Sequence, residues 1–182
     1  MHEQTGLILP DWPAPSNVQA LSTTRLSFQH SAKRDSLAQG YDRFNLALHV
    51  GDDTQHVLQN RQRLSEHLQL AAEDLLWLEQ VHGTHIAAAE LDFADIQNLP
   101  VIADACISRT PRKVCTVMTA DCLPVLFCNI KQNNLADQVA AAHAGWRGLA
   151  EGILTATLSP FSVPNKVIAW LGPAISQKHF EV

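Results

Sequence analysis

The sequence predicts a mixed α/β (α+β) fold, in which a mixed β-sheet forms the core and helices flank it. Three observations support this prediction: short apolar runs bounded by turn residues, two segments with helical periodicity, and an irregular order of strands and helices. A doubly wound fold would show regular βαβ alternation instead. Hydrophobic residues make up 46% of the 182 residues and charged residues 17%, as in ordinary globular proteins. We expect one domain, because no internal repeat or linker divides the chain.

The N-terminal part begins with an extended, proline-containing segment, and a strand is predicted over residues 18–24. The polar residues 27–39 lack periodicity, and we expect a loop there. A helix is predicted over about 54–70, since Asp53 offers N-cap chemistry and apolar residues follow at helical spacing.

The remaining elements are mostly strands. A second amphipathic helix is predicted over 146–158, because Trp146, Leu149, Ile153 and Thr157 recur on one face. The apolar, turn-bounded runs predicted as strands cover residues 75–82, 86–89, 114–120, 123–129, 139–143 and 167–171.

The charge pattern limits the classes of partner. Thirteen basic and 18 acidic side chains give a net charge of −5, and no Lys/Arg block suggests nucleic-acid binding. The apolar stretches are too short to span a bilayer, and the first ten residues lack the pattern of a secretory signal. We therefore expect a cytoplasmic protein. None of the four cysteines forms a CxxC pair, and buried thiols are expected at Cys106, Cys115 and Cys128.

Three residues are candidate ligands of one metal ion: His82, Cys122 and His143. Each lies at the end of an apolar, strand-like run beside glycine, aspartate or proline, where a chain turns. Two imidazoles and a thiolate suit zinc, and three protein ligands leave a fourth position open. Taken singly, each could instead be a hydrogen-bonded histidine or a packed thiol. The separations of 40 and 21 residues do not form a local finger, so the fold must assemble the site.

Other polar residues near these positions are weaker candidates. Arg147 lies in the first turn of the predicted 146–158 helix, where an arginine could hold a phosphate or carboxylate. Asp121 could orient a ligand or accept a proton, or could simply cap the turn. His85 is a possible fourth ligand or acid/base group.

The segments Trp77–Gly83, Val117–Asn129 and Ala142–Gly148 closely resemble the YfiH-like family, which has been labelled multicopper polyphenol oxidase or laccase domain. The resemblance spans nearly the whole chain. Shorter matching pieces are Ser22–Arg25, Phe44–Leu46, Gly51-Asp52, Ala103–Ala105 and Ala169–Ile175.

This resemblance implies a purine nucleoside enzyme. Family members are described as phosphorolysing adenosine, inosine and S-methyl-5′-thioadenosine, and as deaminating adenosine. Their zinc ligands match His82, Cys122 and His143, and the family fold is related to a toxin deamidase of the cysteine-hydrolase type. We expect a monomer that binds purine nucleosides and phosphate.

The resemblance also implies roles for individual residues. Arg25, Asn45 and Arg147 match motif positions near the family's pocket and are expected to bind substrate. Cys122, Arg147 and Asp121 are expected to be catalytic. The family pattern ordinarily continues beyond Val182, which suggests a C-terminally truncated chain.

Three alternative functions remain open at this point. Two histidines and a cysteine, with Met118 as an axial ligand, could bind Cu²⁺ and oxidise phenols, although a four-copper laccase needs many more histidines. Cys122 could be the nucleophile of a cysteine hydrolase that edits peptidoglycan precursors, with His143 or His82 as base. The domain could also bind a small molecule without catalysis.

Overall fold

The structure, a computed structural model, describes residues 6–28, 41, 43–92, 101–131, 133–162 and 166–181. The chain forms two compact units: Met1–Pro10 with Ala20–Ala72, and Asp11–Gln19 with Glu73–Val182. The expectation of a single domain stays a prediction. The expected loop over 27–39 lies, from residue 29 onward, outside the described residues.

The first unit contains a short strand pair and the longest helix. Strand β1 (Leu7–Ile8) pairs antiparallel with β2 (Ser22–Thr23), which is shorter than the strand predicted over 18–24. Helix α1 (Thr54–Leu68) confirms the predicted helix. The Asp53 carboxylate caps it by accepting from the His56 amide at 3.0 Å. It ends two residues earlier than predicted, because Gln69 adopts a left-handed conformation with φ 55°.

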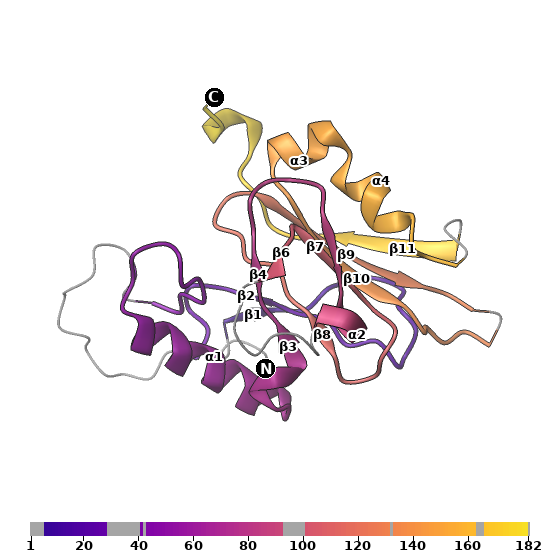
Figure 1. Ribbon diagram of the computed structural model, residues 1–182, viewed down its shortest axis with the longest axis horizontal. Coiled ribbons are helices and arrows are strands. Elements are labelled where there is room, and N and C mark those ends of the chain that lie inside the picture. The colour runs from indigo at the N-terminus through magenta and orange to yellow at the C-terminus, as the bar shows by residue number, and fades with distance from the viewer. Residues whose placement is uncertain are drawn as a thin grey trace. The chain divides into compact units, whose positions relative to one another are not determined.

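The second unit is built around a five-stranded mixed sheet with strand order β11-β9-β10-β7-β5 (Figure 1). Strands β5 and β7 are parallel, and the other pairs are antiparallel, which confirms the mixed sheet. The bounds are β5 (Ile86–Ala88), β7 (Ala105–Ser108), β9 (Leu123–Asn129), β10 (Val139–Ala144) and β11 (Val167–Leu171). Kinship to the cysteine-hydrolase fold of a toxin deamidase stays a prediction.

Two short parallel pairs form separate two-stranded sheets. They are β3 (Leu75–Leu76) with β8 (Val114–Cys115), and β4 (Leu78–Glu79) with β6 (Val101–Ile102). The predicted strand over 75–82 is therefore two separate two-residue strands, and the one over 114–120 keeps only its first two residues.

The predicted helix over 146–158 is wrong as a single element. The structure has α3 (Trp146–Glu151) and α4 (Ile153–Leu158), separated by Gly152. Gly152 adopts a left-handed conformation with φ 94°, and its amide bonds back to the carbonyls of Gly148 and Leu149. Glycine adopts this conformation without a Cβ clash, and the helix therefore ends there. The apolar spacing continues into α4, which is why the sequence pattern does not reveal the break. The described residues also include the helix α2 (Ala89–Asp92) and the 3-10 turns Ala72–Asp74 and Gln177–His179.

Both faces of the central strands are buried. On β7, Ala105 and Ile107 belong to one apolar cluster, whereas Cys106 between them belongs to another. Helix α4 contributes Ile153 to the first cluster, and β3, β4 and β5 contribute to the second. This explains why β10 reads as an almost unbroken run of small apolar residues, since neither of its faces meets water.

The sheet topology brings several strand ends to the same edge. Because β10 runs antiparallel to β9 and β7, its last residues lie beside the first residues of those strands. His143 on β10 is paired with Pro124 on β9, and Ala142 is paired with Ala105, the first residue of β7. Strand β5 begins at the same end, since Ile86 is paired with Ala105. We call this the metal end of the sheet, because the candidate ligands lie there.

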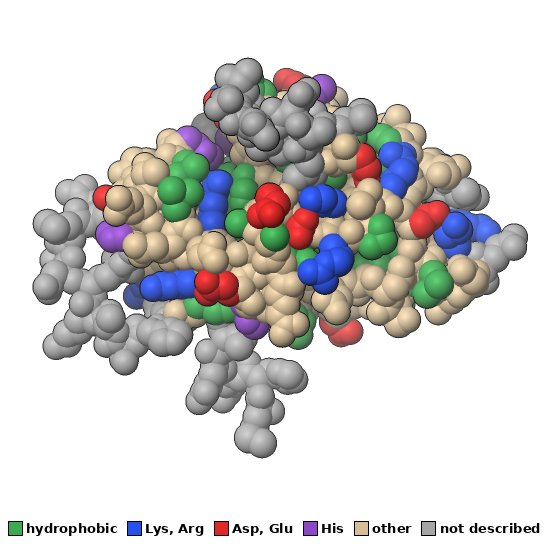
Figure 2. Space-filling view, turned by 60° about the horizontal axis from the view of Figure 1, so that its bottom comes forward, with side chains coloured by type: hydrophobic (Ala, Val, Ile, Leu, Met, Phe, Trp, Pro, Cys, Tyr) green, Lys and Arg blue, Asp and Glu red, His purple; other side chains and the backbone are tan. Residues whose placement is uncertain are grey.

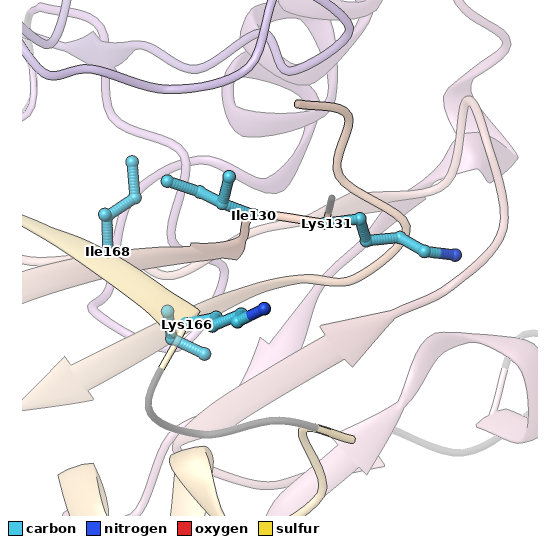
Figure 3. Close-up of a pocket in the computed structure, with 5 residues that line it drawn as sticks. Ile130, Lys131, Lys166 and Ile168 are labelled. Atoms are coloured by element: carbon cyan, nitrogen blue, oxygen red, sulfur yellow. The ribbon is translucent and has the colours of Figure 1, made fainter. Parts of the chain in front are cut away.

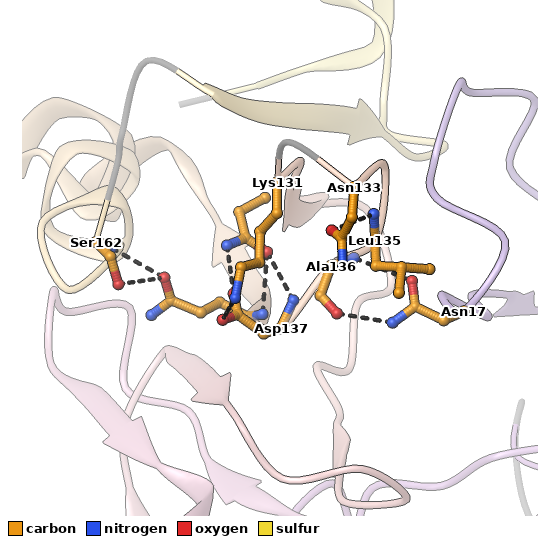
Figure 4. Close-up of polar contacts among 9 residues, drawn as sticks. Asn17, Lys131, Asn133, Leu135, Ala136, Asp137 and Ser162 are labelled. Carbon is orange, nitrogen blue, oxygen red and sulfur yellow. Dashed lines mark hydrogen bonds and ion pairs between the residues drawn. The ribbon is translucent and has the colours of Figure 1, made fainter.

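The opposite end is closed by the β9–β10 turn, whose polar groups bond to one another (Figure 4). The Asn129 side-chain oxygen accepts from the amides of Asp137 and Gln138, each at 3.0 Å. Asn17 holds the turn from outside by exchanging two hydrogen bonds with the Ala136 backbone. These bonds join polar atoms of the turn to one another and to the Asn17 side chain.

The surface carries charges of both signs. On the face shown in Figure 2, Lys and Arg side chains lie among Asp and Glu side chains. A shallow pocket where β9 ends and β11 begins is lined by Ile130, Lys131, Lys166, Val167 and Ile168 (Figure 3). It lies at the opposite end of β9 from Cys122.

No helix within the described ranges has the length and apolar character needed to cross a bilayer.

Candidate metal site

The structure brings His82, Cys122 and His143 together. Their potential ligand atoms all lie within 4.8 Å of one another, and Cys122 Sγ is 4.0 Å from His82 Nε2. The two imidazole rings are nearly perpendicular, with centroids 4.8 Å apart and an interplanar angle of 75°. His143 is buried, Cys122 is half-buried and His82 is exposed, so the group is open to solvent on one side.

Each residue reaches the site by a different route. Cys122 directly precedes β9, and His143 is the next-to-last residue of β10, so the antiparallel pairing of these strands makes them neighbours. His82 comes from the loop between β4 and β5. Its φ of 62° is left-handed, an uncommon conformation for a residue with a Cβ. Such a backbone persists only where surrounding bonds hold it, and it is frequent at functional sites.

Asp104 supplies those bonds. It lies one residue before β7, is fully buried, and accepts a hydrogen bond from His143 Nδ1 at 2.8 Å. Its two oxygens also accept from three successive amides, those of Val81 at 3.2 Å, His82 at 2.9 Å and Gly83 at 2.7 Å. Burial alone would raise the pKa of Asp104. The bonds from His143 and the amides outweigh this and hold the pKa below its ordinary value.

The bond to Asp104 decides which nitrogen of His143 is available. A carboxylate accepts, so Nδ1 of His143 carries the hydrogen, and in the neutral imidazole the lone pair is then on Nε2. Nε2 is the nitrogen that lies toward Cys122 and Gly145, since a Cβ built on Gly145 would be 3.6 Å from it. A carboxylate behind a ligand histidine in this way orients the ring and strengthens it as a donor.

The thiol of Cys122, in contrast, tends to keep its proton when no cation is nearby. Burial raises the pKa of its thiol, and the negative charges of Asp121 and Asp104 raise it further. A nucleophilic thiolate requires the reverse environment, with a lowered pKa. A divalent cation beside the sulfur would oppose these effects, because a coordinated thiol loses its proton.

Gly145 leaves the space between the three residues clear. A Cβ at this position would come within 3.0 Å of both Cys122 Sγ and His82 Cδ2. Gly148, one turn along α3, allows a similar approach, since a Cβ there would be 3.0 Å from the Gly83 carbonyl oxygen. These glycines let the start of α3 pack directly against the ligand residues.

The donor set fits a tetrahedral ion. Zn–N and Zn–S bonds of ordinary length place neighbouring ligand atoms roughly 3.3–3.6 Å apart. The atoms here lie within 4.8 Å of one another, with Cys122 Sγ and His82 Nε2 at 4.0 Å, and movement of the exposed His82 side chain can shorten that distance. Three ligands leave one coordination position open, as in catalytic zinc sites.

The family follows from comparison with known proteins. The sequence profile of the family described as multi-copper polyphenol oxidoreductase laccase matches residues 28–182. The chain belongs to this family. The resemblance to YfiH-like proteins is thereby confirmed, and we use the name YfiH-like family below.

Relatives of the chain carry the name purine nucleoside phosphorylase. Purine nucleoside phosphorylase YfiH of Escherichia coli is 46% identical over 177 residues, which cover 97% of this chain and 66% of that protein. A purine nucleoside phosphorylase of Pseudomonas aeruginosa is 45% identical over 176 residues, covering 96% of this chain and 64% of that protein. The chain thus spans about two thirds of the length of these relatives.

Solved structures support the same assignment. A Neisseria meningitidis protein superposes with a TM-score of 0.79 at 40% identity, covering 98% of this chain and 66% of that one. YlmD of Geobacillus stearothermophilus superposes with a TM-score of 0.76 at 28% identity, covering 96% and 64%. The mixed α+β architecture is therefore that of YfiH-like proteins.

Asp121, predicted as catalytic, lies beside Cys122 at the metal end. It lines a pocket of about 330 Å³ together with Ala120, Pro173, Ala174 and Ile175. The Ile175 amide donates to the Asp121 carbonyl at 2.9 Å and thereby holds the pocket wall against the Asp121–Cys122 turn. The resemblance included the segment Ala169–Ile175 but predicted no role for this wall.

Arg147 follows the site in the chain but is not among the ligand residues. Its guanidinium lies 5.2 Å from the centroid of the exposed Trp146 ring, a cation–π arrangement. The six-residue α3 is shorter than the helix on which the anion-binding argument depended. The assignment of phosphate to Arg147 stays a prediction.

The other predicted residues have separate positions. Arg25 and Asn45 belong to the first unit, where Arg25 is exposed. The Asn45 side chain bonds to the Ala47 backbone and to the Asp52 carboxylate at 3.0 Å. Their role in substrate binding stays a prediction. His85 is not part of the ligand group, although its carbonyl accepts from the amides of Asp104 and Ala105.

Proposed function

We propose that the chain is a zinc-dependent purine nucleoside phosphorylase that acts on adenosine, inosine and S-methyl-5′-thioadenosine and also deaminates adenosine. The observation that carries the proposal is the convergence of His82, Cys122 and His143 in a chain 46% identical to a protein named purine nucleoside phosphorylase YfiH. In phosphorolysis the bond between ribose and base breaks and a phosphate oxygen bonds to the ribose. In deamination water adds to the purine and ammonia leaves.

Zinc suits the donor set better than several coppers. Among the described residues, His82, Cys122 and His143 form the one group of metal-ligating side chains that lies close enough to share an ion. A multi-copper oxidase requires further clusters of histidines, so the family's older description fits this site less well than a single zinc ion. When bound, zinc acts as a Lewis acid toward oxygen and activates water at neutral pH.

The pocket beside Cys122 offers a place for the substrate. It is shallow, and its volume of about 330 Å³ lies at the lower end of the range of small-molecule sites. Pro173, Ala174 and Ile175 provide apolar surface for a purine ring, and Asp121 provides an acceptor for hydroxyl or amino groups of a nucleoside. We assign phosphate to Arg147, whose planar guanidinium can bind two phosphate oxygens at once.

The test is a product analysis on protein of known metal content. Adenosine, inosine and S-methyl-5′-thioadenosine are each incubated with and without phosphate, and adenine, inosine and hypoxanthine are resolved by chromatography. We expect adenine only with phosphate and inosine also without it, both in proportion to bound zinc. Chelator-treated protein and the same protein after zinc restoration are the controls.

Two outcomes would contradict the proposal. Phenol oxidation that tracks stoichiometric copper, with no nucleoside product, would favour the oxidase reading. A covalent acyl-enzyme on Cys122 would favour the cysteine hydrolase reading, because a thiolate that ligates zinc should not form one.

A further inference from the structure

Asp104 is a buried charge whose role lies outside the ligand set. It stands in the apolar stretch Val101–Ile107, and its relative exposure is 0%. An ionised carboxylate removed from water is costly unless it is fully hydrogen-bonded. The groups that bond to Asp104 therefore indicate what it does.

These groups all belong to the two histidine ligands or their immediate neighbours. Oδ1 accepts from His143 Nδ1 and from the His82 amide, and Oδ2 accepts from the amides of Val81 and Gly83. The Asp104 backbone also holds the strand position of His143, whose amide donates to the Asp104 carbonyl at 2.7 Å. One carboxylate thus contacts the ring of one ligand and the backbone of the other.

We propose that Asp104 is the positioning residue that preorganises both histidines for the metal. It holds His143 in the tautomer with hydrogen on Nδ1 and a lone pair on Nε2, and it holds the left-handed backbone of His82 by binding three successive amides. The expected effect on zinc binding rests on the proposed metal site. The arrangement of hydrogen bonds does not depend on which reaction the site performs.

The chemistry requires a carboxylate at this position. Asparagine has the same shape but one acceptor oxygen and one donor NH₂ group. With its oxygen toward His143, the NH₂ would face the N–H groups of Val81 and Gly83, and these amides would lose their acceptor. In the flipped orientation the NH₂ would donate to Nδ1 of His143, which places the hydrogen on Nε2 and blocks that nitrogen as a ligand. Either orientation loses one of the two functions of Asp104.

The first measurement uses the unaltered, zinc-free protein. With ¹⁵N-labelled histidine, two-dimensional NMR distinguishes the two imidazole tautomers, and the His143 signals are assigned by their loss in His143→Gln. We expect hydrogen on Nδ1 of His143 before any metal is added. Hydrogen on Nε2 in the zinc-free protein would overturn the proposal, and this result does not depend on the folding of any Asp104 variant.

The second measurement compares Asp104→Asn with Asp74→Asn. Asp74 is the matched control, because its carboxylate also accepts a hydrogen bond in the second unit, from Lys113 Nζ at 2.7 Å. Zinc affinity is measured by competition with a chromophoric chelator. We expect Asp104→Asn to weaken zinc binding about 10- to 100-fold, and Asp74→Asn to leave it unchanged. The Asp104→Asn protein should also show a changed His143 tautomer or loss of the left-handed His82 conformation.

The outcomes separate this inference from the proposed function. Asp104→Asn with unchanged zinc affinity would overturn the positioning role while leaving the metal site intact. Equal weakening by Asp74→Asn would also overturn it, since the effect would then be one of general stability. If the unaltered protein has the expected tautomer but no zinc affinity, the proposed metal function fails and the hydrogen-bond assignment stands.

Discussion

The two ends of the sheet in the second unit use polar residues in different ways. At the end closed by the β9–β10 turn, the side chains of Asn129 and Asp137 bond to the turn itself and to Lys131. At the metal end, Asp104 binds the backbone around His82 and one nitrogen of His143, while ligand atoms are directed toward one another. The first arrangement satisfies the chain's own polar groups, whereas the second holds side chains that could together bind a metal ion. A dense set of hydrogen bonds therefore does not by itself indicate a functional site. The metal end differs because its hydrogen bonds leave the metal-ligand atoms of three side chains close to one another.

The largest expected effect is that of removing a ligand. Cys122→Ala should reduce bound zinc and nucleoside turnover to background, because a single thiolate contributes one of three protein ligands. Cys122 is only half-buried, so the melting temperature of the zinc-free protein should change little. Metal analysis, product chromatography and thermal melts test this. A zinc-free variant with full activity would contradict the proposed mechanism.

Gly145→Ala should have the next largest effect. The backbone at Gly145 has φ −62°, which alanine adopts readily, but the added Cβ would lie 3.0 Å from Cys122 Sγ and from His82 Cδ2. We expect zinc binding at least about tenfold weaker with the fold retained. Gly83→Ala is the matched control, since its Cβ would meet its nearest atom at an ordinary 3.6 Å. Similar losses in both variants would show that crowding between the ligands is not the cause.

A smaller effect, on stability, is expected where β5 and β7 end, away from the metal end. Burial alone would raise the pKa of Glu90, but hydrogen bonds from the Arg109 amide and the Ser108 hydroxyl help to hold it below its ordinary value. A carboxyl with a lowered pKa stabilises the fold above its ordinary pKa, and this contribution is lost as the pH falls.

Glu90→Gln should therefore lower the melting temperature by a few degrees at pH 7. The difference from the unaltered protein should shrink as the pH falls from about 5 to 3, because both side chains are then neutral. A difference that grew on acidification would contradict the direction of the pKa shift. Zinc affinity at pH 7 should be the same in both proteins.

The smallest effect is expected at the β9–β10 turn. Lys131→Ala removes an ion pair of 2.8 Å to Asp137 in which both side chains are about half exposed, at 51% and 52%. Exposed pairs of this kind contribute at most about 1 kcal/mol. Chemical denaturation should show a change within this range, and zinc binding should not change. A marked loss of zinc would mean that the two ends of the sheet are coupled.

The parts of the fold that the sequence predicted well are those with a local cause. Strands β9 and β11 match the predicted ranges 123–129 and 167–171, because apolar runs there end at turn residues. The helix over 146–158 was mispredicted because periodicity does not reveal that Gly152 adopts φ 94°. The short strands β3 and β8 depend on parallel pairing between distant segments, which no local pattern encodes.

The candidate site, too, was predicted only in part from the sequence. The convergence of His82, Cys122 and His143 was expected, since each ends a strand-like run. Asp104 was noted as part of a family motif but given no role. Its signal was present in the sequence, because a charged residue inside an apolar stretch must find partners when it is buried. Which partners it finds depends on the register between β7 and β10, which only the structure provides.

The distance along the chain between the three ligand residues has a thermodynamic consequence. His82, Cys122 and His143 come from three separate segments, 40 and 21 residues apart in sequence, so the unfolded chain holds no preformed site. An ion bound there joins the loop after β4 to the β9–β10 pair and shifts the folding equilibrium by mass action. At a free concentration of 100 times its dissociation constant, it would add about 2.7 kcal/mol to the stability of the folded state. In this chain a metal ion would thus be a structural cross-link as well as a reagent.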